Sequence, residues 1–343
     1  MYTHVFVTHA PLQEHLADGI IRDLRLDEGR VLVIRVRGSF VAEEKRPYTV
    51  VNGDRFQRST GLNPFKHRRR NAHILASYRR EVTDRLADEY VVYAPMYTYW
   101  YLRALAENSD RYFFLEDGFG SLRTVGEMAA ALPVSAPGGL RNWLRQRGTL
   151  RDQRPAVRTR DALFAGAAGG YVSSPLSFPW LPEERRFVVR NLFTPDYVGQ
   201  YPGAVILALS RPVESGNISL ADYLDLLSYV LGRLRARGLE RAYYKLHPLQ
   251  EAGPHRADYH RVLGGGGTDL TLIALPDHTD VERLAAGNRM TLVTGYSTLA
   301  LSVHQTGNEV LTYLPEMLRR SAGIRSFLSP SIVRTLGEIA NEL

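Results

Sequence analysis

Short apolar runs alternate with stretches of helical periodicity along most of the chain. Apolar runs bounded by turn residues predict strands, whereas apolar residues that recur every three to four positions predict helices. In the first half of the chain, the predicted strands cover residues 3–9, 31–36, 90–94 and 111–115. The predicted helices between them cover residues 11–24, 71–87 and 97–107. This alternation is typical of a parallel sheet covered by helices.

A second alternating set begins near residue 204. Its predicted strands cover residues 204–210, 241–246, 270–275, 290–295 and 309–314. Ser219 is the predicted N-cap of a helix that carries a leucine stripe, formed by Leu220, Leu224, Leu227, Leu231 and Leu234. The stretch from 134 to 200 is rich in Pro, Gly and Arg, and it predicts loops, then a last strand at 187–193 and a linker at 194–203.

The sequence therefore predicts an α/β fold with two Rossmann-like domains facing a central cleft. The predicted N-terminal domain covers residues 1–195, and the predicted C-terminal domain covers residues 196–320. A helical tail at 321–343 is predicted to pack back on the first domain.

Composition narrows the class of protein. The chain has 343 residues, of which 44% are apolar and 23% charged, so a packed core is expected and disorder is not. It has no cysteine, which excludes disulfides, thiolate metal sites and a cysteine nucleophile and fits a reducing compartment. The first residues lack the pattern of a signal peptide, and the apolar run 204–209 is too short to span a bilayer. We expect a cytoplasmic protein, either fully soluble or peripheral at the inner membrane.

The net charge is +7, and the arginines cluster at residues 66–70 and 141–160. Two interpretations remain for these Arg-rich patches: a solvated surface, or contact with an anionic partner such as membrane lipid. No nucleic-acid-binding module is visible, so nucleic acid is not an expected partner.

Three polar motifs follow predicted strands, at the sheet edge where ligands bind in open parallel sheets. They are Glu116-Asp117-Gly118, Lys245-Leu246-His247-Pro248 and Ser297-Thr298. A carboxylate can accept a proton from a hydroxyl, a Lys or His can face a phosphate, and hydroxyls that open a helix can bind an anion. Each motif also has a simpler interpretation, as a turn, a hydrogen-bonded histidine or a helix cap.

In this order, the three motifs resemble those of bacterial sialyltransferases, including polysialyltransferases. The resemblance implies a GT-B fold, a CMP-activated nonulosonic acid such as CMP-sialic acid as the donor, and inversion at the anomeric carbon. The implied acceptor is a cell-surface glycan of capsule or lipooligosaccharide biosynthesis. The resemblance implies no cofactor and no essential metal, and the sequence contains no Asp-x-Asp motif for a metal-bound diphosphate.

The resemblance also implies roles for these residues. The base is expected in the Glu116–Asp117 pair. Adjacent carboxylates near a strand end point to opposite sides, so only one is expected to face the cleft, and we favour Glu116, with Asp117 close behind. His247 is expected to protonate or hydrogen-bond the leaving phosphate, which Ser297 and Thr298 would also hold. The other expected donor-binding residues are Lys245, Pro248 and Glu282.

Other interpretations stay open. A CMP-Kdo or other CMP-nonulosonate transferase would use the same motifs, and an inactive glycan- or membrane-binding protein would use the Arg-rich patches instead. His9 and His304 are lesser candidates for the site, because a histidine among apolar residues is usually a hydrogen-bonded core residue.

Overall fold

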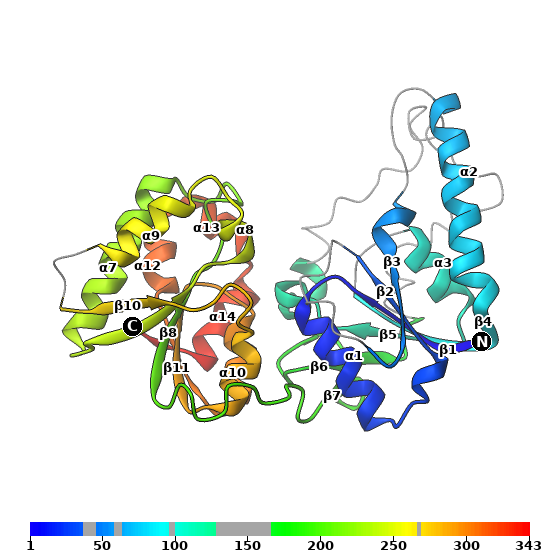
Figure 1. Cartoon of the computed structure of the whole chain (residues 1–343), viewed down its shortest axis with the longest axis horizontal. Helices are drawn as coiled ribbons and strands as arrows, with labels where there is room; N and C mark the ends of the chain where they lie inside the picture. Colours follow the sequence, from blue (N-terminus) through cyan, green and yellow to red (C-terminus); the bar gives the residue numbers. More distant parts are fainter. Residues whose placement is uncertain (37–45, 58–63, 96–99, 128–165, 266–268) are drawn as a thin grey trace. The chain divides into compact units, whose positions relative to one another are not determined.

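The computed structural model describes residues 1–36, 46–57, 64–95, 100–127, 166–265 and 269–343. The chain divides into two compact units, Met1–Leu192 and Phe193–Leu343, each built on a parallel sheet (Figure 1). This boundary lies close to the predicted boundary between residues 195 and 196.

The sheet of the first unit has the order β3-β2-β1-β4-β5-β6-β7. Its strands are β1 (Tyr2–Thr8), β2 (Val31–Arg35), β3 (Thr49–Asn52), β4 (Leu86–Ala94), β5 (Arg111–Leu115), β6 (Gly169–Val172) and β7 (Arg186–Val188). All neighbouring strands are parallel. The chain order reverses between β1 and β4, which is the switch point where open α/β sheets bind ligands. The sequence pattern missed β3 and β6, because four residues are too few to show a period.

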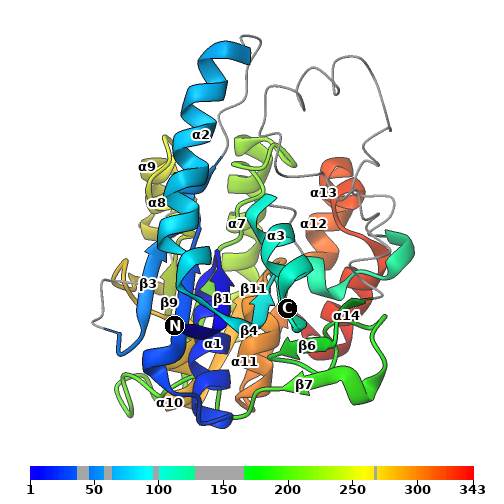
Figure 2. The ribbon, with the colours of Figure 1, turned by 90° about the vertical axis from the view of Figure 1, so that its right-hand side faces the viewer.

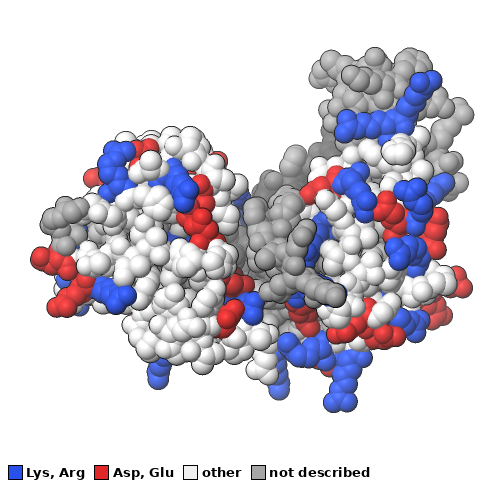
Figure 3. All heavy atoms as spheres, viewed as in Figure 1, with Lys and Arg blue, Asp and Glu red and all other residues white. Residues whose placement is uncertain are grey.

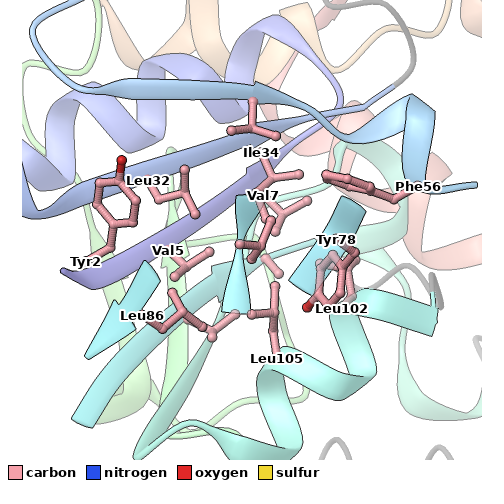
Figure 4. Close-up of a cluster of buried hydrophobic side chains, with 14 of the residues drawn as sticks. Tyr2, Val5, Val7, Leu32, Ile34, Phe56, Tyr78, Leu86, Leu102 and Leu105 are labelled. Atoms are coloured by element: carbon pink, nitrogen blue, oxygen red, sulfur yellow. The ribbon is translucent and has the colours of Figure 1, made fainter. Parts of the chain in front are cut away.

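The helices described in the first unit cover both faces of this sheet. They are α1 (Pro11–Asp23), α2 (Pro64–Glu81) and α3 (Trp100–Asn108). Alternate residues of β1 point to opposite faces, so Val5 and Val7 pack with α2 and α3 (Figure 4). In Figures 1 and 2, α1 lies on the other side of the sheet from α2. Helix α2 ends earlier than predicted, because β4 already begins at Leu86.

The sheet of the second unit has the order β10-β9-β8-β11-β12-β13, again entirely parallel. The strands are β8 (Ala204–Ala208), β9 (Arg241–Lys245), β10 (Thr271–Ala274), β11 (Met290–Thr294), β12 (Glu309–Thr312) and β13 (Asn341–Glu342). The chain order reverses between β8 and β11. The residues that follow these two strands therefore flank the switch point of this unit.

Eight helices of the second unit are described: α7 (Leu220–Ala236), α8 (Pro248–Glu251), α9 (Arg256–Gly264), α10 (Val281–Gly287), α11 (Leu299–Gln305), α12 (Leu314–Arg320), α13 (Ala322–Phe327) and α14 (Pro330–Ile339). Ser219 caps α7 as predicted, because its Oγ accepts a hydrogen bond of 3.1 Å from the Asp222 main-chain N–H. The buried stripe of α7 is shifted from the prediction, since Tyr223 and Leu226 are buried whereas Leu220 and Leu224 are only half-buried.

The tail belongs to the second unit. Strand β13 pairs with β12, and α14 packs against α11. Residues 321–343 thus extend the second unit beyond the predicted limit at residue 320, because the buried face of α14, which includes Ile332 and Leu336, meets an apolar helix of that unit. Contact of this tail with the first domain stays a prediction.

Basic and acidic side chains are interspersed over most of the face drawn in Figure 3. Helix α2 carries exposed arginines in the described part of the 66–70 patch, at Arg69 and Arg70, and again at Arg79 and Arg80. The 141–160 patch lies outside the described residues, so lipid contact by the Arg-rich patches stays a prediction. In the described part of the chain, no helix combines the length and apolar character needed to cross a bilayer.

Candidate functional site

In the first unit, two polar residues meet across the carboxyl ends of the strands. His9 follows β1 and Asp117 follows β5, on either side of β4. The His9 Nε2 lies 2.7 Å from the Asp117 Oδ1. The buried Gln13 side chain ties the two segments together, because its Oε1 accepts from the His9 N–H at 2.8 Å and its Nε2 donates to the Glu116 carbonyl at 3.2 Å. Gly118 then turns the chain with a φ of 50°, which glycine adopts at little cost.

The adjacent carboxylates of Glu116 and Asp117 point to different places. The Glu116 side chain is completely buried, and its Oε2 accepts a hydrogen bond of 2.5 Å from the Ser173 N–H. The Asp117 side chain is 13% exposed beside His9. The expectation that the two carboxylates diverge is confirmed. The Glu116 carboxylate is enclosed by the loop after β6, which argues against the preference for it as the base, and the identity of the base stays a prediction.

Burial raises the pKa of Glu116, although its hydrogen bonds to Ser173 and Ser177 act in the opposite direction. In the folded chain Glu116 therefore stays protonated at pH values somewhat above 4.5, whereas in the unfolded chain it loses its proton near pH 4.5. The stability contribution of protonated Glu116 is thus complete below that pH and is lost as the pH rises through the folded pKa.

As the pH rises from 4.5 to the folded pKa of Glu116, the free energy of unfolding is expected to decrease. Glu116→Gln is expected to make this decrease less steep. Urea unfolding across a pH series measures the effect. The matched control is Glu338→Gln, at an exposed glutamate of α14, which should follow the wild-type curve. A Glu116→Gln curve with the wild-type slope would contradict the assignment of this carboxyl.

In the second unit, Ser210 joins the ends of three neighbouring strands. It follows β8, and its Oγ donates to the Tyr296 carbonyl at 2.5 Å and accepts from the Tyr296 N–H at 3.2 Å, which fixes the segment after β11. The Ser210 carbonyl accepts from the Gln250 Nε2 at 2.8 Å. Gln250 in turn accepts from the His247 N–H after β9 at 3.0 Å. The Lys-x-His-Pro and Ser-Thr motifs are thus brought to one edge of this sheet.

Ser210→Ala is expected to destabilise the second unit by about 1–3 kcal/mol, because two buried main-chain groups of Tyr296 lose their partner. Thermal or urea unfolding measures the change. Ser228→Ala is the matched control, since the Oγ of this exposed serine only bonds back to Leu224 within α7, and its effect should stay within about 0.5 kcal/mol. Equal effects of the two substitutions would refute the linking role of Ser210.

His247 is held as a neutral ring. Its Nδ1 accepts a hydrogen bond of 3.1 Å from the Leu249 N–H, and Pro248 occupies the first position of α8, where its fixed φ suits the helix start. Burial, with a smaller contribution from the positive charge of Arg211, lowers the pKa of His247 to about 4. A neutral ring whose Nδ1 accepts carries its proton on Nε2. His247 therefore offers one N–H donor of fixed direction and, at neutral pH, no charge.

Lys245 points elsewhere. Its Nζ donates to the Asp277 carbonyl at 2.8 Å, and so fastens the loop between β10 and α10. Burial lowers the pKa of Lys245, while the carboxylates of Asp277, Glu251 and Glu282 act against this shift. Glu282 is half-buried in the first turn of α10, on the side of the unit to which Lys245 points. The structure thus groups Lys245 and Glu282 with an acidic loop.

Ser297 and Thr298 are half-buried and directly precede α11, as predicted. The Ser297 Oγ accepts from the Leu299 N–H at 3.2 Å, which leaves its own hydroxyl proton available to a ligand. His304, the lesser candidate, is exposed in the last turn of α11, at the opposite end of this helix.

Several polar residues of these edges were given no role by the sequence reasoning, namely Gln13, Ser210, Arg211 and Gln250. Each lies within five residues of the end of a strand, which was the available signal. Their partners come from other strands, and no local pattern shows such contacts.

Two cavities open elsewhere on the units. One of about 500 Å³ lies at the amino ends of β1, β4 and β5 and is lined by residues such as His4, Arg30 and Asp110. The other, of about 540 Å³, lies beside Asn217, Ser219 and Arg320. Within the described ranges, no three His, Asp or Glu side chains are grouped to hold a metal ion. The expectation of a metal-independent protein stays a prediction.

No family model matches the chain, and no curated protein matches it. Solved structures do match. UDP-GlcNAc 2-epimerase of Methanocaldococcus jannaschii, in complex with UDP-GlcNAc and UDP, is 11% identical with a TM-score of 0.53, over 99% of this chain and 89% of that chain. S. aureus MnaA with UDP is 11% identical with a TM-score of 0.51, over 99% and 92%. These similarities show the fold, so the prediction of two Rossmann-like domains of GT-B type is confirmed.

Proposed function

We propose that the chain is an inverting glycosyltransferase that moves a sialic-acid-type nonulosonic acid from a CMP-activated donor to a hydroxyl of a cell-surface glycan. One observation carries the proposal: each unit places an oriented proton-handling group at the carboxyl end of its sheet. The first unit offers the Asp117 carboxylate beside His9, and the second offers the N–H of neutral His247. A base and a leaving-group donor are the two groups that such a transfer needs.

In this proposal Asp117 is the base. The acceptor oxygen attacks the anomeric carbon and passes its proton to the Asp117 carboxylate, while the bond from that carbon to the phosphate oxygen breaks. The electron pair leaves with CMP, and attack opposite to the leaving group inverts the centre. His9 is a positioning residue, because its contact of 2.7 Å with Oδ1 fixes the direction of the carboxylate.

His247 would act on the leaving group as a hydrogen-bond donor. At neutral pH a ring with a pKa of about 4 is uncharged, so it supplies a directed N–H rather than a proton from an imidazolium. Negative charge grows on the departing phosphate, and a donor fixed in advance stabilises that charge most in the transition state. The hydroxyls of Ser297 and Thr298, two strands away in the same sheet, would bind the same phosphate.

The test is release of CMP from CMP-sialic acid, screened with lipid-linked and capsular glycan acceptors. We expect release that depends on an acceptor and does not need added metal, so that EDTA leaves the rate unchanged. CMP-Kdo in a parallel series distinguishes the nearest alternative donor. Failure of every CMP-linked donor with every acceptor would refute the proposal.

A second function is favoured by the fold similarity to UDP-GlcNAc 2-epimerase. Epimerisation of a UDP-linked sugar would need no acceptor and would release no CMP. Incubation with UDP-GlcNAc alone, followed by separation of the epimeric sugars, tests it directly. Turnover of UDP-GlcNAc together with inert CMP-sialic acid would replace the transferase proposal.

A further inference from the structure

Arg211 occupies the switch point of the second unit. It follows Ser210 at the carboxyl end of β8, between the ends of β9 and β11 in the sheet. The neighbouring Ser210 is bonded to Tyr296 on one side and to Gln250 on the other, and Gln250 is bonded to His247. This short chain of contacts fixes residue 211 between the two motifs of the candidate donor site.

The Arg211 side chain is exposed, and within the described ranges its guanidinium makes no hydrogen bond or ion pair. Its positive charge nevertheless reaches both flanking segments, because it contributes to lowering the pKa of His247 and opposes the rise in the pKa of Tyr296. Lys245, the cation that the sequence motif emphasised, is instead engaged with the Asp277 carbonyl.

We propose that the guanidinium of Arg211 binds the donor phosphate together with the Nε2–H of His247, and that Lys245 does not contact this phosphate. The inference rests on the proposed function, which it deepens by naming the charged ligand of the donor. A guanidinium donates two parallel hydrogen bonds to a phosphate, which orients the group as well as attracting it.

The count of charges favours one class of donor. Among the described residues at the ends of β8, β9 and β11, the cations are Arg211 and Lys245, and Lys245 donates to the Asp277 carbonyl. His247 is neutral, and Ser297 and Thr298 offer hydroxyls. One cation matches the single negative charge of a phosphodiester, as in a sugar linked to a nucleoside monophosphate. A nucleoside diphosphate sugar brings two charges, and the second would have to be met by Lys245, whose Nζ is already engaged with the Asp277 carbonyl.

The test compares the affinities of the full chain for CMP and for cytidine, which differ only in the phosphate. We expect Arg211→Met to weaken CMP binding about 10- to 100-fold in calorimetry and to leave cytidine binding unchanged. Arg289→Met is the matched control, because this exposed arginine precedes β11 at the opposite edge of the sheet. Lys245→Met should lower the melting temperature but keep the wild-type ratio of CMP to cytidine affinity.

Each outcome of this comparison supports or overturns the role of Arg211 or the proposed donor. Wild-type CMP affinity in Arg211→Met, or an equal loss in Arg289→Met, would overturn the role of Arg211 while the transferase proposal stands. A loss of CMP affinity confined to Lys245→Met would show that Lys245, and not Arg211, binds the phosphate. Wild-type protein that binds UDP but not CMP would overturn the proposed donor, and Arg211→Met then shows whether the arginine still binds the phosphate. Wild-type protein that binds neither nucleotide overturns both.

Discussion

Asp117→Asn is expected to lower kcat for transfer by about 10²- to 10⁴-fold, the range that a positioned general base contributes. An amide has nearly the size of the carboxylate and can keep the contact with His9, but it cannot accept the proton of the acceptor hydroxyl. Because Asp117 is only 13% exposed, its removal could also disturb the segment that Gln13 holds. The melting temperature must therefore be measured beside initial rates of CMP release.

Glu116→Gln is the matched control for this experiment. It changes the neighbouring carboxylate in the same way, but that side chain is completely buried against Ser173. We expect Glu116→Gln to change stability and its pH dependence and to retain far more activity than Asp117→Asn. A larger loss of activity in Glu116→Gln than in Asp117→Asn would identify Glu116 as the base. Full activity of both variants would show that neither residue is the base.

His247→Ala is expected to lower kcat by about 10²- to 10³-fold, the usual loss when one donor to a developing oxyanion is removed. The same substitution also removes the cap that accepts the Leu249 N–H, so activity and stability would fall together. His247→Asn separates the two effects, because the Asn side chain can still cap α8 but no longer places an N–H where Nε2 lies.

We therefore expect His247→Asn to unfold near the wild-type temperature and to transfer nearly as poorly as His247→Ala. The pH profile provides a second readout. Since the pKa of His247 is lowered to about 4, activity should not rise as the pH falls through 6.5, as it would if the enzyme needed a charged imidazole of ordinary pKa. Wild-type kcat in His247→Asn would leave His247 as a helix cap only.

The sequence by itself determined most of the architecture. The runs 204–210 and 290–295 could be predicted as strands because β8 and β11, which they contain, are largely buried in a parallel sheet, which favours apolar residues in the run. Ser219 could be assigned as a cap from its position before an apolar period, since capping involves only residues of the same turn. The sequence also showed that acidic, His-Pro and Ser-Thr motifs follow strands.

Only the tertiary structure decided the surroundings of each side chain in these motifs. Glu116 and Asp117 are neighbours with the same chemistry, and packing of Ser173 after β6 on one side and of His9 after β1 on the other separates their environments. Lys245 and Arg211 also differ in their surroundings for the same reason, because the Asp277 carbonyl engages the lysine whereas Ser210 and Gln250 link the segment of the arginine to His247. Local periodicity fixes which residues form an element, but the burial and charge of a side chain at a strand end depend on partners distant in sequence.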